Sequence, residues 1–429
     1  MRASRLLLSK NLRATIPYDP SNTAAVFGDK STSSLLLCAA LFKLCSYRPL
    51  VDAASALLAS SIPVVSPLAR AVVKRTIFPL FVSGESMGAC LETSSQLKTF
   101  AGVSTILDHN VEERETEDAW EANLANKLTL LQRITEDPSA AAVRFVPLKA
   151  TALLCPRLLE TMSAHMYMQL GGTDRNDLEV LAKLSPAECA LLSTGMARLE
   201  TICQAASRSG RLGILLDAEQ SHRQPAIEYI AQQLAAKFNR SAENCLLYNT
   251  YQMYTKRSAA ALQRDVDAAR REGYILGVKL VRGAYIATER RKGRSGGEDP
   301  IFSTKAETDA NYNATMTGLL EHVRVGRACL LLATHNRQSV DLAVATMDKL
   351  GLPSTHPGVS FASIMGMVNN VSNALGLAGY NSNKLVSFGV YDDVLPWLLR
   401  RLHENNDAFG AMQLERRLFL KEVKRRIVG

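Results

Sequence analysis

Hydrophobic and polar positions follow two different patterns along the chain, and the change between them occurs near residue 100. Beyond that point short runs of apolar and β-branched residues alternate with longer amphipathic stretches, which is typical of buried parallel strands separated by helices. The strand candidates are 102–108 (GVSTILD), 143–150 (VRFVPLKA), 212–217 (LGILLD), 244–252 (NCLLYNTYQ), 275–283 (ILGVKLVRG), 328–334 (ACLLLAT), 356–363 (HPGVSFAS) and 384–389 (KLVSFG). Helix-length stretches fall at 185–208, 223–238, 257–272, 304–325 and 336–350, and a last helix is expected from about 392 to 405.

Eight buried strands in alternation with helices predict an α/β fold of the (β/α)8 TIM-barrel type. An open, doubly wound sheet is the alternative, but no Gly-rich dinucleotide fingerprint follows an early strand. Before the barrel, apolar residues recur at helical spacing through 34–59, with breaks at Pro63 and Pro67. The chain therefore divides into a helical N-terminal region at 29–100 and a barrel at 101–410.

The amino terminus is basic and free of acids. Arg2, Arg5, Lys10 and Arg13 precede the first carboxylate, Asp19, and leucines and serines lie between them. This composition predicts a mitochondrial transit peptide at 1–28, although an ordinary basic terminus has the same features. These cations account for part of the net charge of +9, and aromatic residues are only 6% of the chain. With no binding motif either, a nucleic-acid partner is not expected.

Neither the cysteines nor the apolar runs indicate a metal site or a membrane span. The eight cysteines form no C-x-x-C pair, and scattered thiols in apolar runs are typical of free cysteines in a reducing compartment. No window offers about 18 clean apolar residues. The C-terminal tail, 411–429, contains a basic amphipathic stretch at 414–428, and we hypothesise that it holds the protein at an anionic membrane surface.

Polar residues stand at the ends of six of the predicted strands. They are Asp108, Lys149, Asp217 with Glu219, Gln252, Lys279 with Arg282, and Thr334-His335-Asn336. Catalytic residues of a (β/α)8 barrel lie at the carboxyl ends of its strands, so these are the candidates for chemistry. The segment 290–297 (RRKGRSGG), after the fifth strand, is either a solvated loop or a flap over a cofactor.

The last predicted helix adds a cationic face. Trp397, Arg400, Arg401 and Glu404 share one side of it by their spacing. Two inward guanidiniums require an anion, and a substrate carboxylate would supply it through bidentate hydrogen bonds. The alternative is a surface arginine pair held by Glu404.

Several long motifs, in order, are similar to those of the proline dehydrogenase family, and most closely to its eukaryotic mitochondrial branch. They are FVSGES (81–86), LLDAEQSHRQPAIEYI (215–230), NTYQMYTKRS (249–258), GVKLVRGAYIATER (277–290), EDPIFSTKAETDANY (298–312), ATHNRQSV (333–340), IMGM (364–367) and LPWLLRRLHEN (395–405). The resemblance implies a distorted barrel that holds FAD non-covalently and oxidises L-proline to Δ1-pyrroline-5-carboxylate, the first step of proline catabolism to glutamate. It also implies peripheral attachment to the matrix side of the mitochondrial inner membrane, where ubiquinone takes the electrons.

The resemblance also assigns roles to residues. Arg400 and Arg401 match the paired arginines that hold the substrate carboxylate, Lys149 matches the lysine that joins them, and Asp217 matches the acid that orients this cluster. The positions that match flavin contacts are Gln252, Lys279, Arg282, Gly283, Ala284, His335, Asn336 and Glu404, with Lys305 and Thr308 near the adenosine end.

Two positions expected to line the substrate ring depart from the family. Trp397 and Leu385 stand where the family has tyrosines, and Ser363 stands where glutamine is frequent. Either proline remains the substrate or the pocket is reshaped for another cyclic imino acid. An apolar wall offers the hydroxyl of a hydroxylated proline no partner, so we expect such substrates to be poorer.

Two further classes of function remain as alternatives. A Schiff-base aldolase on the same barrel would use Lys149 or Lys279 as its nucleophile. The second alternative is an inactive, membrane-attached binding protein. Such a protein would not need the charged residues Lys149, Asp217, Arg400 and Arg401, so their presence argues against it.

Overall fold

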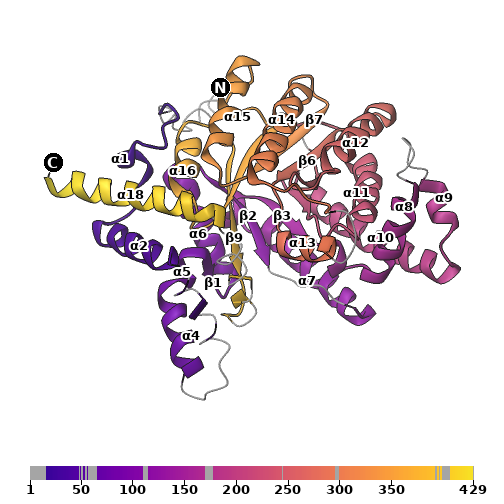
Figure 1. Ribbon diagram of the computed structural model, residues 1–429, viewed down its shortest axis with the longest axis horizontal. Helices are drawn as coiled ribbons and strands as arrows, with labels where there is room; N and C mark the ends of the chain where they lie inside the picture. Colours follow the sequence, from indigo (N-terminus) through magenta and orange to yellow (C-terminus); the bar gives the residue numbers. More distant parts are fainter. Residues whose placement is uncertain are drawn as a thin grey trace, which may run out of the picture.

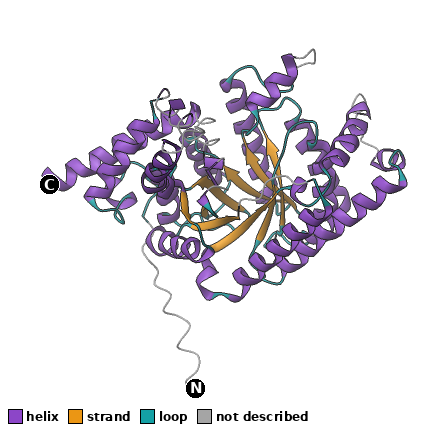
Figure 2. Cartoon of the chain, turned by 90° about the horizontal axis from the view of Figure 1, so that it is seen from below, coloured by secondary structure: helices purple, strands orange, loops and turns teal. Residues whose placement is uncertain are grey.

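The computed structural model contains a closed barrel of eight parallel strands (Figures 1 and 2). The structure describes residues 16–47, 49, 52–53, 56, 65–109, 115–169, 177–243, 245–294, 299–391, 394–395, 397–398 and 406–428. The barrel strands are β2 (Ser104–His109), β3 (Val143–Leu148), β4 (Gly213–Leu216), β5 (Leu247–Gln252), β6 (Leu276–Val281), β7 (Ala328–Ala333), β8 (Val359–Ile364) and β9 (Ser382–Phe388). Each pairs with the next, and β9 closes the barrel against β2. All eight predicted strands are therefore confirmed.

Helices cover the outside of the barrel, because each parallel strand needs a crossover to return the chain to the same end. In chain order they are α7 (Glu117–Glu136), α8 (Pro156–Gln169), α9 (Asp177–Ala182), α10 (Pro186–Ser207), α11 (Gln224–Phe238), α12 (Ser258–Glu272), α13 (Ile286–Arg294), α14 (Lys305–Arg324), α15 (Arg337–Lys349) and α16 (Asn369–Leu377), with short 3-10 turns η1 (Pro138–Ala142) and η2 (Ala150–Ala152) beside β3. The five crossover helices predicted from the sequence are among them. Capping boxes begin α10 at Ser185 and α14 at Thr304.

The N-terminal region is mostly helical and packs on one side of the barrel (Figure 1). It contains α1 (Thr23–Val26), α2 (Thr32–Cys45), α4 (Val65–Thr76), α5 (Phe78–Phe81) and α6 (Met87–Ala101). The pattern did not predict β1 (Val82–Gly84), a short strand that pairs in parallel with the end of β9. Its three residues are too few to show the alternation of apolar and polar positions that marks a strand.

The C-terminal helix α18 (Asn406–Val428) lies against α2 and α1. Phe419 packs on Phe27 and Phe42, with ring centroids 4.8 and 5.5 Å apart, so the ends of the chain form one apolar cluster. The predicted helix at 392–405 falls largely outside the described residues. No described helix is long and apolar enough to cross a membrane.

Candidate active site

The two-residue period of the strands places one layer of polar side chains above an apolar floor inside the barrel. The floor is a buried cluster that includes Ile106, Phe145, Leu215, Tyr248, Leu331 and Ala362. Side chains two residues apart on a strand share a face. The residues two or four positions beyond this floor therefore point inward at the carboxyl ends of the strands: Asp108, Lys149, Asp217 and Gln252. Lys279 lies on β6 and reaches this layer through its contact with Asp217.

An ion pair crosses this mouth. The Nζ of Lys279 donates to Oδ1 of Asp217 at 2.6 Å, and both side chains are mostly screened from solvent. Asp217 follows β4 and Lys279 lies on β6. Because β5 stands between these two strands, the ion pair spans the end of β5. The resemblance had placed Asp217 with the substrate-binding cations and Lys279 near the flavin. In the structure one hydrogen bond joins these two groups of residues.

Asp108 lies in the same charge cluster, at the end of β2. Burial raises the pKa of its carboxyl group, the lysines Lys127, Lys149 and Lys279 lower it, and Asp217 raises it further. Three cations and two carboxylates thus influence one another here. Cations outnumber carboxylates in this set of residues, and an excess of cationic groups favours an anionic ligand such as a substrate carboxylate.

Lys127 is a buried cation that sequence reasoning missed. It extends from α7, is 6% exposed and donates to the carbonyl of Pro147 in β3 at 3.2 Å. Burial lowers the pKa of its ammonium, and the carboxylates of Asp108 and Asp217 raise it. A lysine inside an amphipathic helix gives no sign in the sequence that it points toward a barrel.

Gln252 connects the loops that follow β4 and β6. Its side-chain nitrogen donates to the carbonyl of Glu219 at 2.8 Å, and its side-chain oxygen accepts from the backbone N–H of Ala284 at 3.1 Å. Glu219 is itself buried, and its carboxylate accepts from the backbone and hydroxyl of Thr151. The strand-end residue Glu219 is therefore a structural anchor that fixes the rim of the mouth.

Gly283 lets the chain pass close to an aromatic ring. Its φ is +152°, and a Cβ at this position would lie 2.2 Å from Cδ1 of Tyr254. Only glycine fits both the backbone angle and the space. The backbone after β6 can therefore turn along the mouth at Gly283 and Ala284.

Arg282 is engaged by protein partners. Its guanidinium donates to Asp309 at 2.6 Å, to Thr334 at 2.7 Å and to Ser339 at 2.8 Å, and lies 4.3 Å from the ring centroid of Tyr312. These contacts join β6, α14, β7 and α15. Arg282 therefore holds the shape of this side of the mouth.

The beginning of α14 carries the two residues matched to the adenosine end. Lys305, at the first position of the helix, pairs with Asp309. Thr308 is 9% exposed, and its hydroxyl donates to the carbonyl of Thr304 at 3.3 Å. Asp309 binds both Lys305 and Arg282, so the N-terminus of α14 and the end of β6 form one unit.

His335 and Asn336 follow β7. The Nε2 of His335 accepts from the backbone N–H of Ile364 at 3.1 Å, which assigns the proton of a neutral ring to Nδ1. Asn336 caps α15, accepting from the N–H of Ser339 at 3.2 Å. Both side chains thus have structural partners at the rim, and the assigned tautomer makes Nδ1 a hydrogen-bond donor.

The two departures from the family lie in one apolar cluster. Trp397 is 7% exposed and packs with residues of α5 and β1, and the partly buried Leu385 packs against both this cluster and the barrel floor. Ser363 instead bonds the hydroxyl of Ser372 in α16 at 2.8 Å, on the outer face of β8, and does not point into the mouth. Arg400, Arg401 and Glu404 fall outside the described residues.

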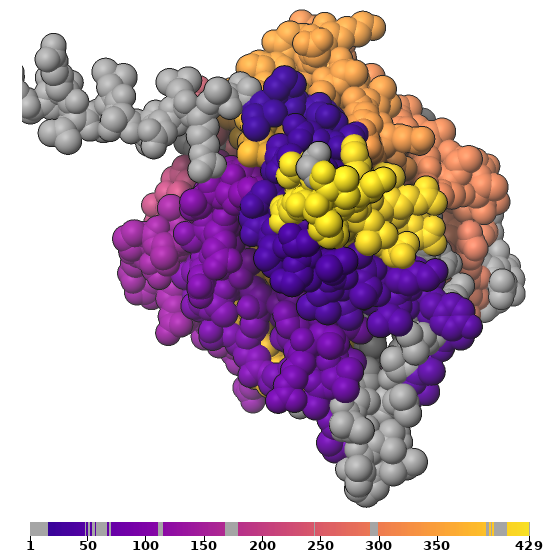
Figure 3. All heavy atoms as spheres, turned by 90° about the vertical axis from the view of Figure 1, so that its left-hand side faces the viewer, coloured from indigo at the N-terminus to yellow at the C-terminus, as the bar shows by residue number. Residues whose placement is uncertain are grey.

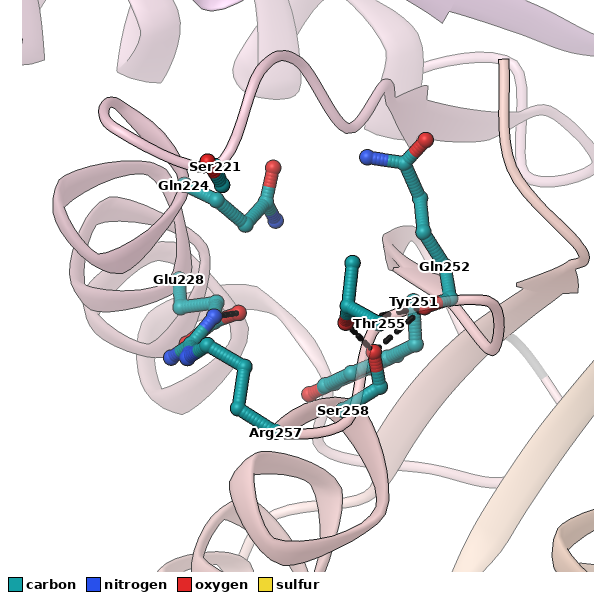
Figure 4. A pocket seen from close by; sticks show the side chains of 8 residues that line it. All are labelled: Ser221, Gln224, Glu228, Tyr251, Gln252, Thr255, Arg257 and Ser258. Atoms are coloured by element: carbon teal, nitrogen blue, oxygen red, sulfur yellow. Dashed lines mark hydrogen bonds and ion pairs between the residues drawn. The ribbon is translucent and has the colours of Figure 1, made fainter. Parts of the chain in front are cut away.

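A second polar network lies beside the mouth, around a cavity of about 20 Å³ (Figure 4). Arg257 binds the buried carboxylate of Glu228 through two hydrogen bonds of 2.8 and 2.7 Å. The amide of Gln252 and the side chain of Gln224 approach from opposite sides (Figure 4). A cavity of this size holds about one water, so it is not a substrate site. These residues belong to the QPAIEYI and NTYQMYTKRS motifs, and their spacing had not revealed the ion pair.

No group of three or more histidines, cysteines and carboxylates in the described part of the chain could hold a metal ion. Six of the eight cysteines are buried, Cys155 is partly buried and Cys189 is exposed, and all are free thiols.

Comparisons with known proteins agree on one relationship. The family model "Proline dehydrogenase" matches residues 90–413. "Hydroxyproline dehydrogenase" of Bos taurus is 32% identical over 100% of this chain and 98% of its own length. "Proline dehydrogenase 2, mitochondrial" of Arabidopsis thaliana is 29% identical over 96% of this chain and 92% of its own.

A solved structure shares the fold. Proline utilization A from Bdellovibrio bacteriovorus superimposes with a TM-score of 0.66 over 80% of this chain, at 19% identity. The match covers 34% of that longer protein, so the chain spans about a third of it.

Proposed function

Because the chain belongs to the proline dehydrogenase family, and is thus an enzyme that oxidises proline or hydroxyproline, we propose that its substrate is L-proline and its cofactor FAD. The product would be Δ1-pyrroline-5-carboxylate, and the reaction would begin the catabolism of proline to glutamate. The observation that carries the proposal is the charged layer at the strand ends, in which Lys279 binds Asp217 over the apolar floor of the barrel.

The residues at the mouth suit a flavin nucleotide. Gly283 brings the backbone after β6 close to the rim, where a side chain would block it. Donors lie along the ends of β5 to β7, which suits the carbonyl oxygens and phosphates of FAD. We propose that the flavin contacts Gln252, Lys279, Gly283, Ala284, His335 and Asn336, that Lys305 and Thr308 contact the adenosine end, and that Glu404 lies toward the flavin.

Arg282 contributes to this site mainly by holding the surrounding strands and helices in place. Three of its N–H groups already bind Asp309, Thr334 and Ser339. Any contact with FAD would use its remaining N–H groups. Its main role would be to keep β6, α14 and β7 in register around the cofactor.

Lys149, Arg400 and Arg401 would hold the substrate carboxylate. Three cations fix a carboxylate in position and orientation, which is catalysis by orientation. Asp108 and Asp217 balance the lysines of the mouth and hold Lys279 across it. A bound FAD would supply the hydride acceptor, and these residues would align ring carbon C5 of the substrate with it.

Hydroxyproline is the second candidate substrate. Five relatives at 29–32% identity, over 93–100% of this chain, are named hydroxyproline dehydrogenase. Leu385 replaces a tyrosine of the family and leaves an apolar surface next to Trp397. We propose that this wall favours proline, because a substrate hydroxyl facing it would lose its hydrogen bonds to water.

The cellular setting is part of the same proposal. Relatives of the chain are named mitochondrial, which indicates a mitochondrial location. We propose the matrix side of the inner membrane, peripheral attachment to it and ubiquinone as the electron acceptor.

Mass spectrometry of the product tests the proposed reaction. The purified protein should convert L-proline, with a soluble dye as acceptor, into a compound lighter by two hydrogens. Borohydride added during turnover should not attach substrate to Lys149 or Lys279. Covalent trapping at either lysine would favour the aldolase instead.

A further inference from the structure

The helix α2 is apolar on two opposite faces. Leu35, Cys38, Phe42 and Cys45 are buried against α18 and its neighbours. The opposite face carries three exposed leucines: Leu36, Leu37 and Leu44, at 47%, 55% and 50% exposure. Helical spacing puts them on one stripe with the exposed Ala40 and Lys43, and Tyr47, two residues beyond the end of the helix, is 63% exposed. A helix that is apolar all round is normally covered on both sides, and no element among the described residues covers this stripe.

The neighbouring helix α18 supplies positive charge on the same side of the molecule. Its exposed residues include Arg417, Lys421 and Lys424, and also Arg425, which pairs with Glu422. Both acids among its described side chains, Glu415 and Glu422, are fully buried, so no described acid of α18 reaches the surface. The two helices lie side by side on one face of the protein (Figures 1 and 3).

The two buried acids of α18 bind groups inside the protein, which explains why the exposed side of the helix is positively charged. Glu422 binds Arg425 and Arg426 within the helix, and Arg426 also donates to the carbonyls of Lys30 and Phe27. Glu415 accepts from the backbone N–H of Asn369 at 2.8 Å. The apolar side of α18 is likewise used, because Met412, Phe419 and Val423 pack against α1 and α2. The part of α18 available to a partner therefore combines these cations with four exposed apolar side chains: Leu414, Leu420, Ile427 and Val428, at 39%, 38%, 72% and 74% exposure.

We infer that the exposed stripe of α2 and the cationic face of α18 together dock the protein on an anionic phospholipid bilayer. The leucines would enter the headgroup boundary, with Tyr47 at its polar edge, and the lysines and arginines would face lipid phosphates. A second copy of the chain is a poorer partner, because a two-fold contact would bring two cationic α18 faces together. This inference rests on the membrane attachment proposed above and adds α2 to the contact that was assigned to the C-terminal tail.

Co-sedimentation of the full-length protein with vesicles tests the inference. Vesicles of phosphatidylcholine alone are compared with vesicles that also contain phosphatidylserine. Binding should require the anionic lipid. Lys421→Gln with Lys424→Gln should weaken it by about 30-fold, because each cation near such a surface contributes about fivefold. Leu37→Asp with Leu44→Asp should abolish the bound fraction.

Matched controls separate docking from folding and from catalysis. Leu191→Asp changes an exposed leucine of α10 that is 40% exposed, and Arg270→Gln with Arg271→Gln removes two exposed cations of α12; neither should change binding. Turnover with a water-soluble dye should be the same in all variants. A loss of dye turnover in the unmodified protein would count against the proposed reaction and leave the docking result standing.

Three results would overturn the inference. The protein could fail to bind anionic vesicles, or bind them equally well in the α2 and α18 variants. It could also form a dimer in the absence of lipid that Leu37→Asp with Leu44→Asp converts to a monomer, in which case the stripe is an interface between copies of the chain.

Discussion

Lys279 donates a hydrogen bond to Asp217 at 2.6 Å across the mouth of the barrel, from β6 to the loop after β4. Asp217→Asn keeps a hydrogen-bonding group of the same size but removes the charge that holds the lysine. We expect the flavin to remain bound. Its reduction by substrate should slow by about 100-fold, because a displacement of about 1 Å between reacting groups can reduce a rate by that factor. Anaerobic stopped-flow absorbance measures the step. An unchanged reduction rate would show that the pair has no part in alignment.

The buried Lys127 should set the pH dependence of the reaction through Asp108. Burial raises the pKa of Asp108 and Lys127 lowers it, so Lys127→Met should raise that pKa further. A higher pH is then needed to ionise the carboxylate, and the acid limb of kcat/KM should move to higher pH. Lys127→Arg keeps the charge and should largely restore the original profile. If Lys127→Met lowers activity equally at every pH, the lysine has only a packing role.

Gly283→Ala should expel the cofactor. The added Cβ would meet the ring of Tyr254 at 2.2 Å, at a φ of +152° that side chains rarely adopt. Flavin content per chain, measured by absorbance after desalting, should fall to a small fraction. Gly273→Ala is the matched control, because Gly273 also has a positive φ of +71° but nothing lies within 4 Å of its added Cβ. It should cost about 1 kcal/mol of stability and leave the flavin bound.

The barrel could be predicted from the sequence because its signals are local. Each strand, such as 328–334, is a short apolar run, and each crossover helix has its own periodicity. The polar strand ends, including Lys149, Asp217 and Lys279, could be predicted for the same reason. The contacts between these residues could not be predicted. The sequence does not show that Asp217 meets Lys279, because that contact depends on how the barrel closes.

Long-range contacts account for the other features that sequence reasoning missed. Lys127 points inward from a helix whose pattern looks ordinary. Glu228 and Arg257 are 29 residues apart and meet beside β5. The basic amphipathic pattern at 414–428 does not say which element its apolar side meets, and in the structure that side packs on α2, at the other end of the chain. In each case the decisive partner is distant in sequence.

The electrostatic interaction between the buried residues Lys384 and Glu415 should couple the stability of the protein to pH. Lys384 is buried in β9, and its ammonium donates to the carbonyls of Ile364 and Met367. Burial lowers its pKa to about 7, and Glu415 raises it. Burial likewise raises the pKa of Glu415, and Lys384 lowers it. Glu415→Gln removes this electrostatic interaction, so we expect the free energy of unfolding to fall.

The sign of the pH effect follows from the lowered pKa of Lys384. Above a folded pKa of about 7 the folded protein binds fewer protons at Lys384 than the unfolded chain does, so this residue makes stability rise with pH. Without Glu415 that pKa falls further, and the rise begins at a lower pH. Denaturation of Glu415→Gln should therefore show the largest loss below pH 7 and a smaller loss above it. Lys384→Met with Glu415→Leu should recover most of the stability, and failure to do so would mean that the carboxylate serves mainly to hold the N–H of Asn369.

The most direct test of the account is an anaerobic absorbance spectrum of the purified protein, titrated first with L-proline and, in a separate sample, with 4-hydroxy-L-proline. We expect a flavin band that L-proline bleaches at a lower concentration than the hydroxylated analogue. Bleaching by hydroxyproline alone would assign Leu385 and Trp397 to a pocket for that substrate and contradict the proposed specificity. A protein that contains no flavin and takes up none when FAD is added would contradict the proposed chemistry.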